Sequence, residues 1–408
     1  MKWTRFPGAI GAFVAEMDFG TAPAISRALE SAIANYQFGY LSPQLLEAFA
    51  QSFTNFAFRK YDWTLQPSQV RPIPDVLAGI EAIIRFLLPP DAVIILPTPA
   101  YMPFRPLFRD LGCSVIEVPM VQSPFGQYVN DLVGISAGFA AASAQGKTGC
   151  LILVNPHNPT GRVLTEAELL AICDTVSKYD GRVIADEIHA PLVYPGFRHI
   201  PYASLNSVAA AHSFTLVSAS KAWNLAGLKA AQLVLTNDAD LRIWERRGQW
   251  TEHMTATIGV IASIAAYDNG AEWLSELLDY LAANRKFLTE FLAARLPSVR
   301  YYPPEGTYLT WLDFRDHKFP QVSEYLEAER AIRMNDVDSE RYQTDLAASE
   351  RSVSPAAYLL QHAGVALTDG RQCGRSGLGF ARLNIATPRP ILEQTLNQIA
   401  DALADLEA

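Results

Sequence analysis

Cysteine is scarce in this sequence, and the few cysteines lack the spacing of a metal site or a disulfide framework. The four are far apart and include no C-x-x-C pair: Cys113, Cys150, Cys173 and Cys373. Zinc modules and small secreted domains depend on closely spaced cysteines. The pattern therefore predicts isolated thiols in a reducing compartment and no metal site.

Long apolar runs and excess positive charge are also missing. No run approaches the roughly 18 apolar residues of a membrane span, and residues 1–5 lack the apolar core of a signal peptide. The net charge is −9 and the isoelectric point is near 5.4, whereas nucleic-acid-binding domains that rely on general electrostatics are usually basic. We therefore expect a cytoplasmic protein that binds neither membrane nor nucleic acid.

What the sequence does have is the composition of a large folded protein. Half of its 408 residues are hydrophobic and 18% are charged, so the chain can bury a core and is not disordered. From about residue 65, short apolar runs rich in β-branched residues are separated by helical patterns. Apolar runs of this kind are typical of a mainly parallel sheet covered by helices on both faces, which makes the fold class α/β. The expected strands are 70–75, 92–96, 114–118, 150–154, 182–185, 214–217 and 232–235.

We expect three parts along the chain. Residues 1–42 form an N-terminal arm, with a helix over 22–36 that Gly39 stops. Residues 43–283 form a large domain, and residues 284–408 form a smaller α+β domain with an alternating strand at 305–313 and another strand at 380–385. Between these two strands, 15 of the 37 residues 315–351 are Asp, Glu, Lys or Arg, which indicates a solvated insertion. Further helices are expected at 43–61, 76–88, 165–179, 257–269 and 272–296.

A lysine-containing segment follows the expected strand 214–217. Residues 218–229 read Ser-Ala-Ser-Lys-Ala-Trp-Asn-Leu-Ala-Gly-Leu-Lys, with two hydroxyls directly before Lys221 and a second lysine, Lys229, eight residues later. A lysine at the end of a buried strand can have a lowered pKa and act as a nucleophilic amine. Taken alone, such a segment is more often a surface lysine beside a turn.

Three other features lie where strands end or helices begin. Asn158 belongs to the run N-P-H-N-P-T-G at 155–161, in which two Asn-Pro pairs indicate a rigid turn. Asp186 follows the strand 182–185, and a carboxylate there can hold a ring nitrogen protonated. Asp75 opens a helix whose free N–H groups can hold a phosphate. Ligand sites of doubly wound sheets lie beyond the carboxyl ends of the strands, so we expect these features to converge.

Each of these residues also has a purely structural explanation. Asn158 could cap a turn, Asp186 could cap a helix, Tyr101 could belong to the core and Arg382 could pair with a surface carboxylate. Their order along one chain is harder to explain in that way. A phosphate cradle, a stacking aromatic ring, an amide, a carboxylate and a lysine are the parts needed to hold pyridoxal 5′-phosphate.

Over nearly its whole length, residues 14–389, the chain resembles fold-type I pyridoxal-phosphate enzymes of the class I/II aminotransferase superfamily. Within it, the chain is most similar to the C–S lyase branch, the cystathionine β-lyase-like (MalY/PatB) proteins, and especially to the actinobacterial β C–S lyases. The specific motifs are N-P-H-N-P-T-G and S-K-A-W-N-L-A-G-L. The resemblance is carried by residues 2–7, 14–19, 155–161, 186–192, 220–229, 306–309 and 381–384.

This resemblance implies a large domain with a mainly parallel seven-stranded sheet, a smaller α+β domain, and a homodimer with shared active sites. It implies that Lys221 forms the Schiff base with the cofactor and moves protons, that Asp186 pairs with the pyridine nitrogen and that Tyr101 stacks on the ring. Asn158 would contact the ring's phenolic oxygen and the substrate, and Arg382 would bind the substrate α-carboxylate. The other implied cofactor contacts are Asp75, Val76, Leu77, His189, Ser218, Ser220, Lys229 and, from the partner subunit, Tyr40, which would also reach the substrate.

Two positions depart from the wider superfamily. Many aminotransferases have a tyrosine three residues after the aspartate, where this chain has His189, as is expected for the lyase branch. The position eight residues after the Schiff-base lysine is often arginine. Here it is Lys229, a point charge without the guanidinium fork, so the phosphate would be held less rigidly.

The implied reaction is α,β-elimination from cystathionine or another cysteine S-conjugate, giving a thiol, pyruvate and ammonia. A thiolate leaves readily, so the main barrier is removal of the Cα proton. An aminotransferase is the alternative enzyme, because it shares the early steps, although residues 189–192 and 220–228 favour the lyase. A ligand-sensing regulator is a further alternative, but it would need a basic helix-turn-helix ahead of residue 14. For the substrate side-chain pocket we expect 13–19, Tyr40 and 306–310.

Overall fold

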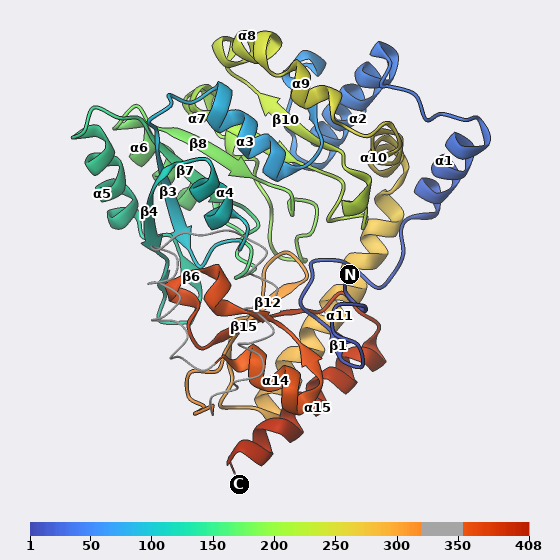
Figure 1. Ribbon diagram of the computed structural model, residues 1–408, viewed down its shortest axis with the longest axis vertical. Coiled ribbons are helices and arrows are strands. Elements are labelled where there is room, and N and C mark those ends of the chain that lie inside the picture. The colour runs from blue at the N-terminus through green and yellow to red at the C-terminus, as the bar shows by residue number, and fades with distance from the viewer. Residues whose placement is uncertain (320–353, 408) are drawn as a thin grey trace.

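Two larger β-sheets organise the chain, of which the computed structural model describes residues 1–319 and 354–407 (Figure 1). A seven-stranded sheet lies in one half of the molecule and a four-stranded sheet in the other. Most of the expected charged insertion at 315–351 lies outside the described residues.

The seven-stranded sheet has the order β2-β10-β9-β8-β7-β3-β4. β10 runs antiparallel to both of its neighbours, and the remaining neighbours pair in parallel. The sequence-based prediction of an α/β fold around a mainly parallel seven-stranded sheet is therefore confirmed. The strands are β2 (Val70–Ile73), β3 (Val93–Thr98), β4 (Ser114–Pro119), β7 (Gly149–Val154), β8 (Arg182–Asp186), β9 (Ser213–Val217) and β10 (Ala231–Leu235).

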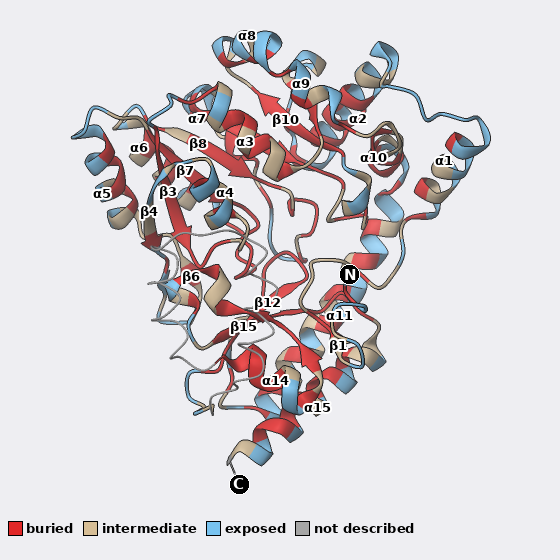
Figure 2. Cartoon of the chain, viewed as in Figure 1, coloured by how far each residue is buried: buried red, intermediate tan, exposed pale blue. Residues whose placement is uncertain are grey.

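Alternate residues of the central strands pack into different cores because successive side chains point to opposite faces of a sheet. Ile94 and Leu96 of β3 belong to one core, whereas Ile95 between them belongs to another. Both faces are buried, as the continuous red of the strands in Figure 2 shows. One core includes residues of α3 (Val76–Phe86), α4 (Phe104–Asp110) and α8 (Asp238–Arg247), and the other residues of α5 (Leu132–Ser143), α6 (Glu166–Ser177) and α7 (Ser207–His212).

Local sequence explains where several of these helices begin. Asp75 caps α3 by accepting a hydrogen bond from the backbone N–H of Ala78. Thr165 and Glu168 form a reciprocal capping box at the start of α6. Ser42 caps α2 (Pro43–Tyr61), whose first helical residue is a proline. The predicted starts of these three helices are thus confirmed, while α3 ends at Phe86, two residues earlier than expected.

The predicted glycine stop after the first helix is wrong. α1 (Pro23–Ala34) ends well before Gly39, with Asn35 as its C-cap. It ends there because the next residue, Tyr36, adopts a left-handed conformation with φ of 55°. The N–H groups of Tyr36 and Gln37 then bond back to the carbonyls of Ile33 and Ala32, which is the Schellman closure that glycine usually provides. Gly39 lies in the connection to α2.

The second half of the molecule contains the antiparallel sheet β11-β12-β15-β14. β12 begins at Leu309 rather than 305, and all five of its residues are buried. The expected alternation of buried and exposed residues is absent because apolar clusters cover both faces of β12, with Leu312 in one cluster and Trp311 in another. The strands are β11 (Arg300–Tyr301), β12 (Leu309–Asp313), β14 (Thr368–Asp369) and β15 (Phe380–Asn384).

Helices and short strands join the two halves. α9 (Gln249–His253) and α10 (Thr257–Asn269) precede the long α11 (Ala271–Arg295), which leads into the four-stranded sheet (Figure 1). α14 (Pro355–Ala363) and α15 (Arg389–Glu407) complete the second half, and β5 (Val121–Gln122) pairs with β6 (Tyr128–Val129). In the N-terminal arm, β1 (Ile10–Gly11) pairs in parallel with β13 (Val365–Ala366), so the first residues pack on the C-terminal part of the chain.

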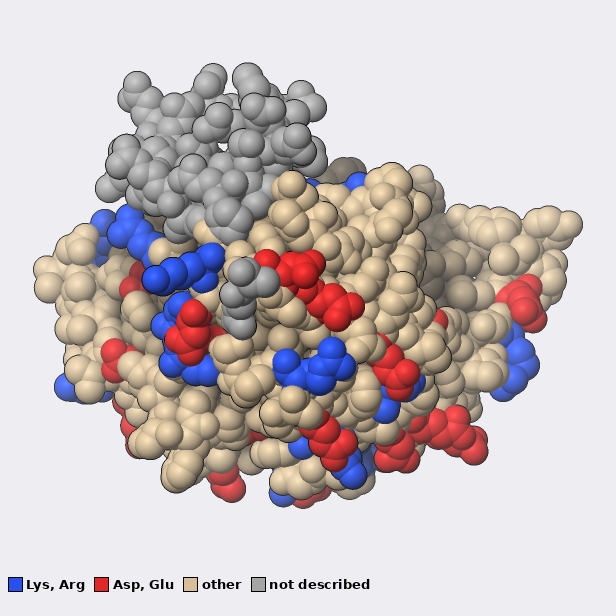
Figure 3. Space-filling view, turned by 90° about the horizontal axis from the view of Figure 1, so that it is seen from below, with Lys and Arg blue, Asp and Glu red and all other residues tan. Residues whose placement is uncertain are grey.

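The surface carries charges of both signs. On the face shown in Figure 3, basic and acidic side chains are interspersed, and no field of one sign dominates it. Within the two described ranges, none of the helices is long and apolar enough to cross a membrane.

Candidate active site

Several of the predicted site residues lie at one edge of the seven-stranded sheet. Asp186 is the last residue of β8 and pairs in register with Val154 of β7 and Leu216 of β9. The turn that contains Asn158 follows β7, and the segment with Ser218 and Lys221 follows β9. Because the strands are parallel, their carboxyl ends bring these segments together.

Asp186 is a buried carboxylate without a cation at ion-pair distance among the described residues. Its side chain is 5% exposed, and Oδ1 accepts a hydrogen bond of 3.1 Å from the backbone N–H of Ile188. Burial raises the pKa of this carboxyl to about 6, although the Ile188 bond and the nearby Lys221 act in the opposite direction. The site therefore offers a carboxylate that a bound cation would stabilise.

Lys221 is partly buried behind the N-terminal arm. Its Nζ donates a hydrogen bond of 3.1 Å to the carbonyl oxygen of Ala15. Burial lowers its pKa to about 8, the positive charge of Arg382 adds to this effect, and the carboxylates of Glu16 and Asp186 oppose it. A lysine with such a pKa is partly neutral near neutral pH, which is the state in which its amine is nucleophilic.

Arg382 is fully buried, and each of its bonded nitrogens has neutral acceptors. Nη1 donates to Asn158 Oδ1 at 2.9 Å, and Nη2 donates to the carbonyl oxygen of Phe13 at 2.8 Å and to Thr368 Oγ1 at 3.1 Å. Its Nε has no hydrogen-bond partner. Burial lowers the pKa of the guanidinium, and among the described residues no carboxylate lies within ion-pair distance of it. The cluster is complementary to an anion.

The start of α3 and the segment after β9 also meet. Asp75 Oδ2 accepts an ion-pair bond of 2.8 Å from Lys229 Nζ, and the Lys229 side chain is 58% exposed. Lys229 itself has a left-handed backbone conformation. Ser218 Oγ donates to the carbonyl oxygen of Ala230 and accepts from the N–H of Ser220. Val76 and Leu77 follow Asp75 in the first turn of α3.

Two rings lie near these groups. Tyr101 is partly buried and packs edge-on against Phe104 with ring centroids 5.3 Å apart. His189 is buried and lies edge-on to Tyr308 at 6.0 Å, and its Nδ1 has no hydrogen-bond partner. Burial, with Lys221 and Arg382 nearby, lowers the pKa of His189 well below its usual value, so its ring is neutral.

Tyr40 is the predicted site residue that this single chain does not bring to the site. It is 86% exposed, and its ring packs against His253 at 5.1 Å, at the surface near α9. It does not line the cavity described next.

A cavity of about 520 Å³ contains the reactive groups. Lys221, Tyr101 and Arg382 line it together with Phe13, Val14 and Ala15 of the arm. Of the segments expected to form the side-chain pocket, these three arm residues lie in its wall, whereas 306–310 and Tyr40 do not. Its other described lining residues are Met1, Arg5, Phe6, Met102, Ala357, Leu360, Gln361, Leu367, Thr368 and Gln372.

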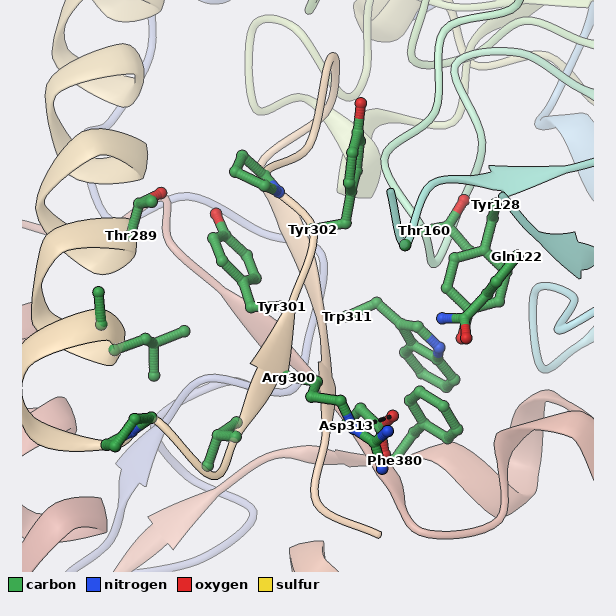
Figure 4. A pocket seen from close by; sticks show the side chains of 16 residues that line it. Gln122, Tyr128, Thr160, Thr289, Arg300, Tyr301, Tyr302, Trp311, Asp313 and Phe380 are labelled. Atoms are coloured by element: carbon green, nitrogen blue, oxygen red, sulfur yellow. Dashed lines mark ion pairs between the residues drawn. The ribbon is translucent and has the colours of Figure 1, made fainter. Parts of the chain in front are cut away.

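A larger cavity of about 610 Å³ contains none of the predicted site residues. Figure 4 shows Trp311 stacked on Phe380 in this cavity near Tyr128, with Tyr301 and Thr289 among the other lining residues. Size alone therefore does not locate the chemistry in this molecule.

Sequence reasoning missed the residues that hold the arm over Lys221. Asn224 accepts a hydrogen bond from the N–H of Met17 and donates to the carbonyls of Met17 and Gly20. Asn384 donates to the carbonyls of Val14 and Glu16. Both asparagines lie in motifs that carried the family resemblance, but a single sequence does not show which backbone they bind.

The site residues fit pyridoxal phosphate, which the resemblance implied. Asp186 is a buried carboxylate that matches a protonated pyridine nitrogen, and Lys221 is an amine that can react with an aldehyde. The N-terminus of α3 is next to the Ser218 segment and Lys229, where a phosphate matches the free N–H groups. Fold and site together define a pyridoxal-phosphate enzyme of fold type I.

Comparison with known proteins places the chain within this class. The family model for aminotransferases of class I and II matches residues 14–402, and the chain belongs to this family. It is 35% identical to the cystathionine β-lyase of Corynebacterium glutamicum, over 99% of this chain and 96% of that protein. It is 27% identical to the cystathionine β-lyase PatB of Bacillus subtilis (strain 168), over 97% and 93% of the two chains.

A solved structure of a C–S lyase is similar to this chain over nearly its whole length. The PLP-bound C–S lyase from Staphylococcus hominis superposes with a TM-score of 0.81 at 27% identity, covering 98% of this chain and 95% of that one. The predictions of family, fold type and cofactor are thereby confirmed. The roles of individual site residues and the domain boundaries at 42 and 283 stay predictions.

Proposed function

We propose that this protein is a pyridoxal-phosphate-dependent C–S lyase. It takes a cysteine thioether such as cystathionine, together with water, and releases a thiol, pyruvate and ammonia. The observation that carries the proposal is the full-length match, at 35% identity, to a protein named cystathionine β-lyase. The site supports it with a lysine and a buried carboxylate at one edge of the seven-stranded sheet and a buried arginine that bonds to Asn158 there.

The groups near the ring of the cofactor come from the strand ends. When bound, pyridoxal phosphate supplies an electron sink that lowers the barrier to breaking bonds at the substrate Cα. Lys221 would hold the cofactor through its amine, and the same Nζ would accept the Cα proton of the substrate. Asp186 keeps the pyridine nitrogen protonated, and its own burial makes it a strong partner for that cation. Tyr101 would stack on the cofactor ring, and Asn158 and His189 would be further contacts of the cofactor.

The other groups hold the phosphate and the substrate. The first turn of α3 at Asp75, Val76 and Leu77, together with Ser218, Ser220 and Lys229, binds the phosphate. To reach the phosphate, Lys229 must break its ion pair with Asp75. Arg382 binds the α-carboxylate, which supplies the anion that the buried guanidinium lacks. Asn158 accepts a hydrogen bond from Arg382, and this bond fixes how the guanidinium is oriented towards the substrate.

We also propose a homodimer and a cytoplasmic location. The dimer is supported by exposed apolar side chains around the α1–α2 connection and α9: Ile33, Tyr36, Phe38, Tyr40, Trp250 and Met254. Exposed apolar patches of this kind mark protein–protein contacts. In the dimer, Tyr40 of the partner subunit would reach the cofactor phosphate and the substrate. The cytoplasmic location is supported by four cysteines without a disulfide bond.

One assay separates the lyase from the aminotransferase. Purified protein loaded with pyridoxal phosphate is incubated with L-cystathionine in the absence of any keto acid. We expect stoichiometric free thiol and pyruvate over many turnovers. If turnover requires an added keto acid and pyruvate does not accumulate, the protein is an aminotransferase.

The dimer has a separate test. Light scattering on the wild-type protein is expected to give twice the mass of one chain, and Trp250→Glu is expected to shift the mass towards the monomer. A wild-type monomer at micromolar concentration would contradict the proposal.

A further inference from the structure

Basic side chains line the cavity that contains Lys221, and no carboxylate of the described residues lines it. Its charged side chains, among the described residues, are Arg5, Lys221 and Arg382. The carboxylates of Glu16 and Asp186 act on Lys221 but do not line the cavity. The two guanidinium groups around this space of about 520 Å³ make it attractive to ligands with more than one negative group.

Two of the three cations already have a place in the proposed reaction. Lys221 holds the cofactor, and Arg382 takes the α-carboxylate of the reacting amino acid. Arg5 has no such place, although it lies in the motif at residues 2–7 that carried the family resemblance. Among the described residues it has no carboxylate within ion-pair distance, and its side chain is exposed. The guanidinium of Arg5 is therefore available to an anionic group of a ligand in this cavity.

Aromatic rings hold Arg5 in the wall of the cavity. Its guanidinium carbon lies 5.5 Å from the ring centroid of Phe6 and 5.8 Å from that of Phe13. Stacking on rings orients a guanidinium and leaves its N–H groups available in the plane. The carbonyl oxygen of the same Phe13 accepts a bond from Arg382. Phe13 thus contacts both arginines, Arg5 through its ring and Arg382 through its carbonyl oxygen.

We propose that Arg5 binds a carboxylate on the leaving half of the substrate. The proposal rests on the proposed lyase function and makes Arg5 the residue that selects thioethers with a carboxylate on the leaving half. Such a molecule carries one carboxylate at Cα, for Arg382, and a second beyond the sulfur, for Arg5. The bidentate fork of arginine suits both contacts.

The test uses two substrates that differ only at the distal group. S-(2-carboxyethyl)-L-cysteine carries a carboxylate, and S-(2-carbamoylethyl)-L-cysteine carries a neutral amide of the same shape. For the carboxylate substrate, Arg5→Gln is expected to raise KM about fivefold to thirtyfold with kcat changed less than about twofold, since an ionic hydrogen bond at an exposed site is lost. For the amide substrate, KM is expected to change less than about twofold. Arg5→Lys should retain part of the preference.

A control and a binding measurement complete the design. Arg242→Gln, at an exposed position of α8 outside the cavity, is expected to leave both KM values unchanged. Calorimetry with L-2-aminopimelate, which has no thioether to cleave, should show the same loss of affinity in Arg5→Gln.

The possible failures are distinguishable. If the wild-type enzyme releases no thiol or pyruvate from either substrate, the lyase function is wrong, and the calorimetric comparison still decides the role of Arg5. If Arg5→Gln weakens both substrates equally, or neither, the distal carboxylate is not bound by Arg5.

Discussion

Two walls of the active site are built in different ways. The strand-end wall consists of Asn158, Asp186, Ser218 and Lys221, which follow neighbouring parallel strands. The arm wall consists of Phe13, Ala15, Thr368 and Arg382, which come from the two ends of the chain. The strand-end wall is fixed by the sheet itself, whereas the arm wall is assembled from contacts between distant segments.

This difference separates the two proposed tasks. The strand-end wall would hold the cofactor, which is the same in every turnover. The arm wall would hold the substrate, and the segment 13–17 is attached by hydrogen bonds with Asn224 and Asn384. Substitutions in the first wall should therefore change cofactor retention, and substitutions in the second should change KM.

The largest effect is expected at Lys221. Lys221→Ala removes the amine that holds the cofactor and accepts the Cα proton, so turnover should fall at least about a thousandfold. Borohydride reduction should leave no cofactor covalently attached to the variant. Lys229→Ala is the matched control, in which covalent attachment persists. Covalent trapping in Lys221→Ala would show that another lysine has this role.

The buried carboxylate of Asp186 is expected to destabilise the cofactor-free protein although turnover requires it. Its folded pKa of about 6 lies above the unfolded value of 3.8, so the unfolded chain releases its proton first as the pH rises. Below pH 3.8 the carboxyl is protonated in both states and does not change the free energy of unfolding. As the pH rises from 4 to 6, the free energy of unfolding of the cofactor-free protein falls by up to about 3 kcal/mol. Asp186→Asn should remove this loss while turnover falls.

Urea unfolding of the cofactor-free protein at pH 5 and pH 8 measures the Asp186 effect. The variant should be the more stable protein at pH 8, and the difference should shrink at pH 5. A variant that is less stable at pH 8 would mean that the carboxylate has a cationic partner in solution.

Arg382 is expected to affect the substrate and not the cofactor. Arg382→Gln removes an ionic contact to the α-carboxylate, so kcat/KM should fall about tenfold to a hundredfold. The visible absorbance of the bound cofactor should be unchanged. Because the guanidinium is buried without an anion, the cofactor-free variant should be at least as stable as the wild type. Loss of the cofactor in this variant would break the proposed division between the two walls.

The smallest effect is expected at Asn224. Its φ of 60° makes Asn224→Gly the suitable change, because glycine accepts this conformation and removes only the side chain. Losing three hydrogen bonds to the arm should raise KM about threefold to tenfold and speed proteolysis of the first 20 residues. An unchanged KM together with faster proteolysis would show that the arm does not order the substrate.

The strand-end wall could be predicted from the sequence because each of its residues lies next to a recognisable strand. Asp186 and Lys221 follow apolar runs, and the polarity of the sheet brings their segments to one edge. The helix starts at Asp75 and Thr165 were readable for a similar reason, since capping is a contact within four residues.

The arm wall could not be predicted in the same way. Phe13 and Arg382 are 369 positions apart, and no local pattern records which backbone carbonyl a buried guanidinium will bind. The predicted end of α1 was also wrong, because Tyr36 and not Gly39 adopts the left-handed conformation that ends the helix. The positions of Tyr40 and Arg5 depend in turn on surfaces that a single sequence does not describe.

The place of the first residue has a practical consequence for handling the protein. Met1 lines the cavity that contains Lys221, while α15 carries the opposite end of the chain to the far tip of the molecule (Figure 1). A purification tag fused ahead of Met1 would extend from the mouth of the active site and compete with substrate for the space beside Arg5. A tag placed after α15 leaves that opening unobstructed.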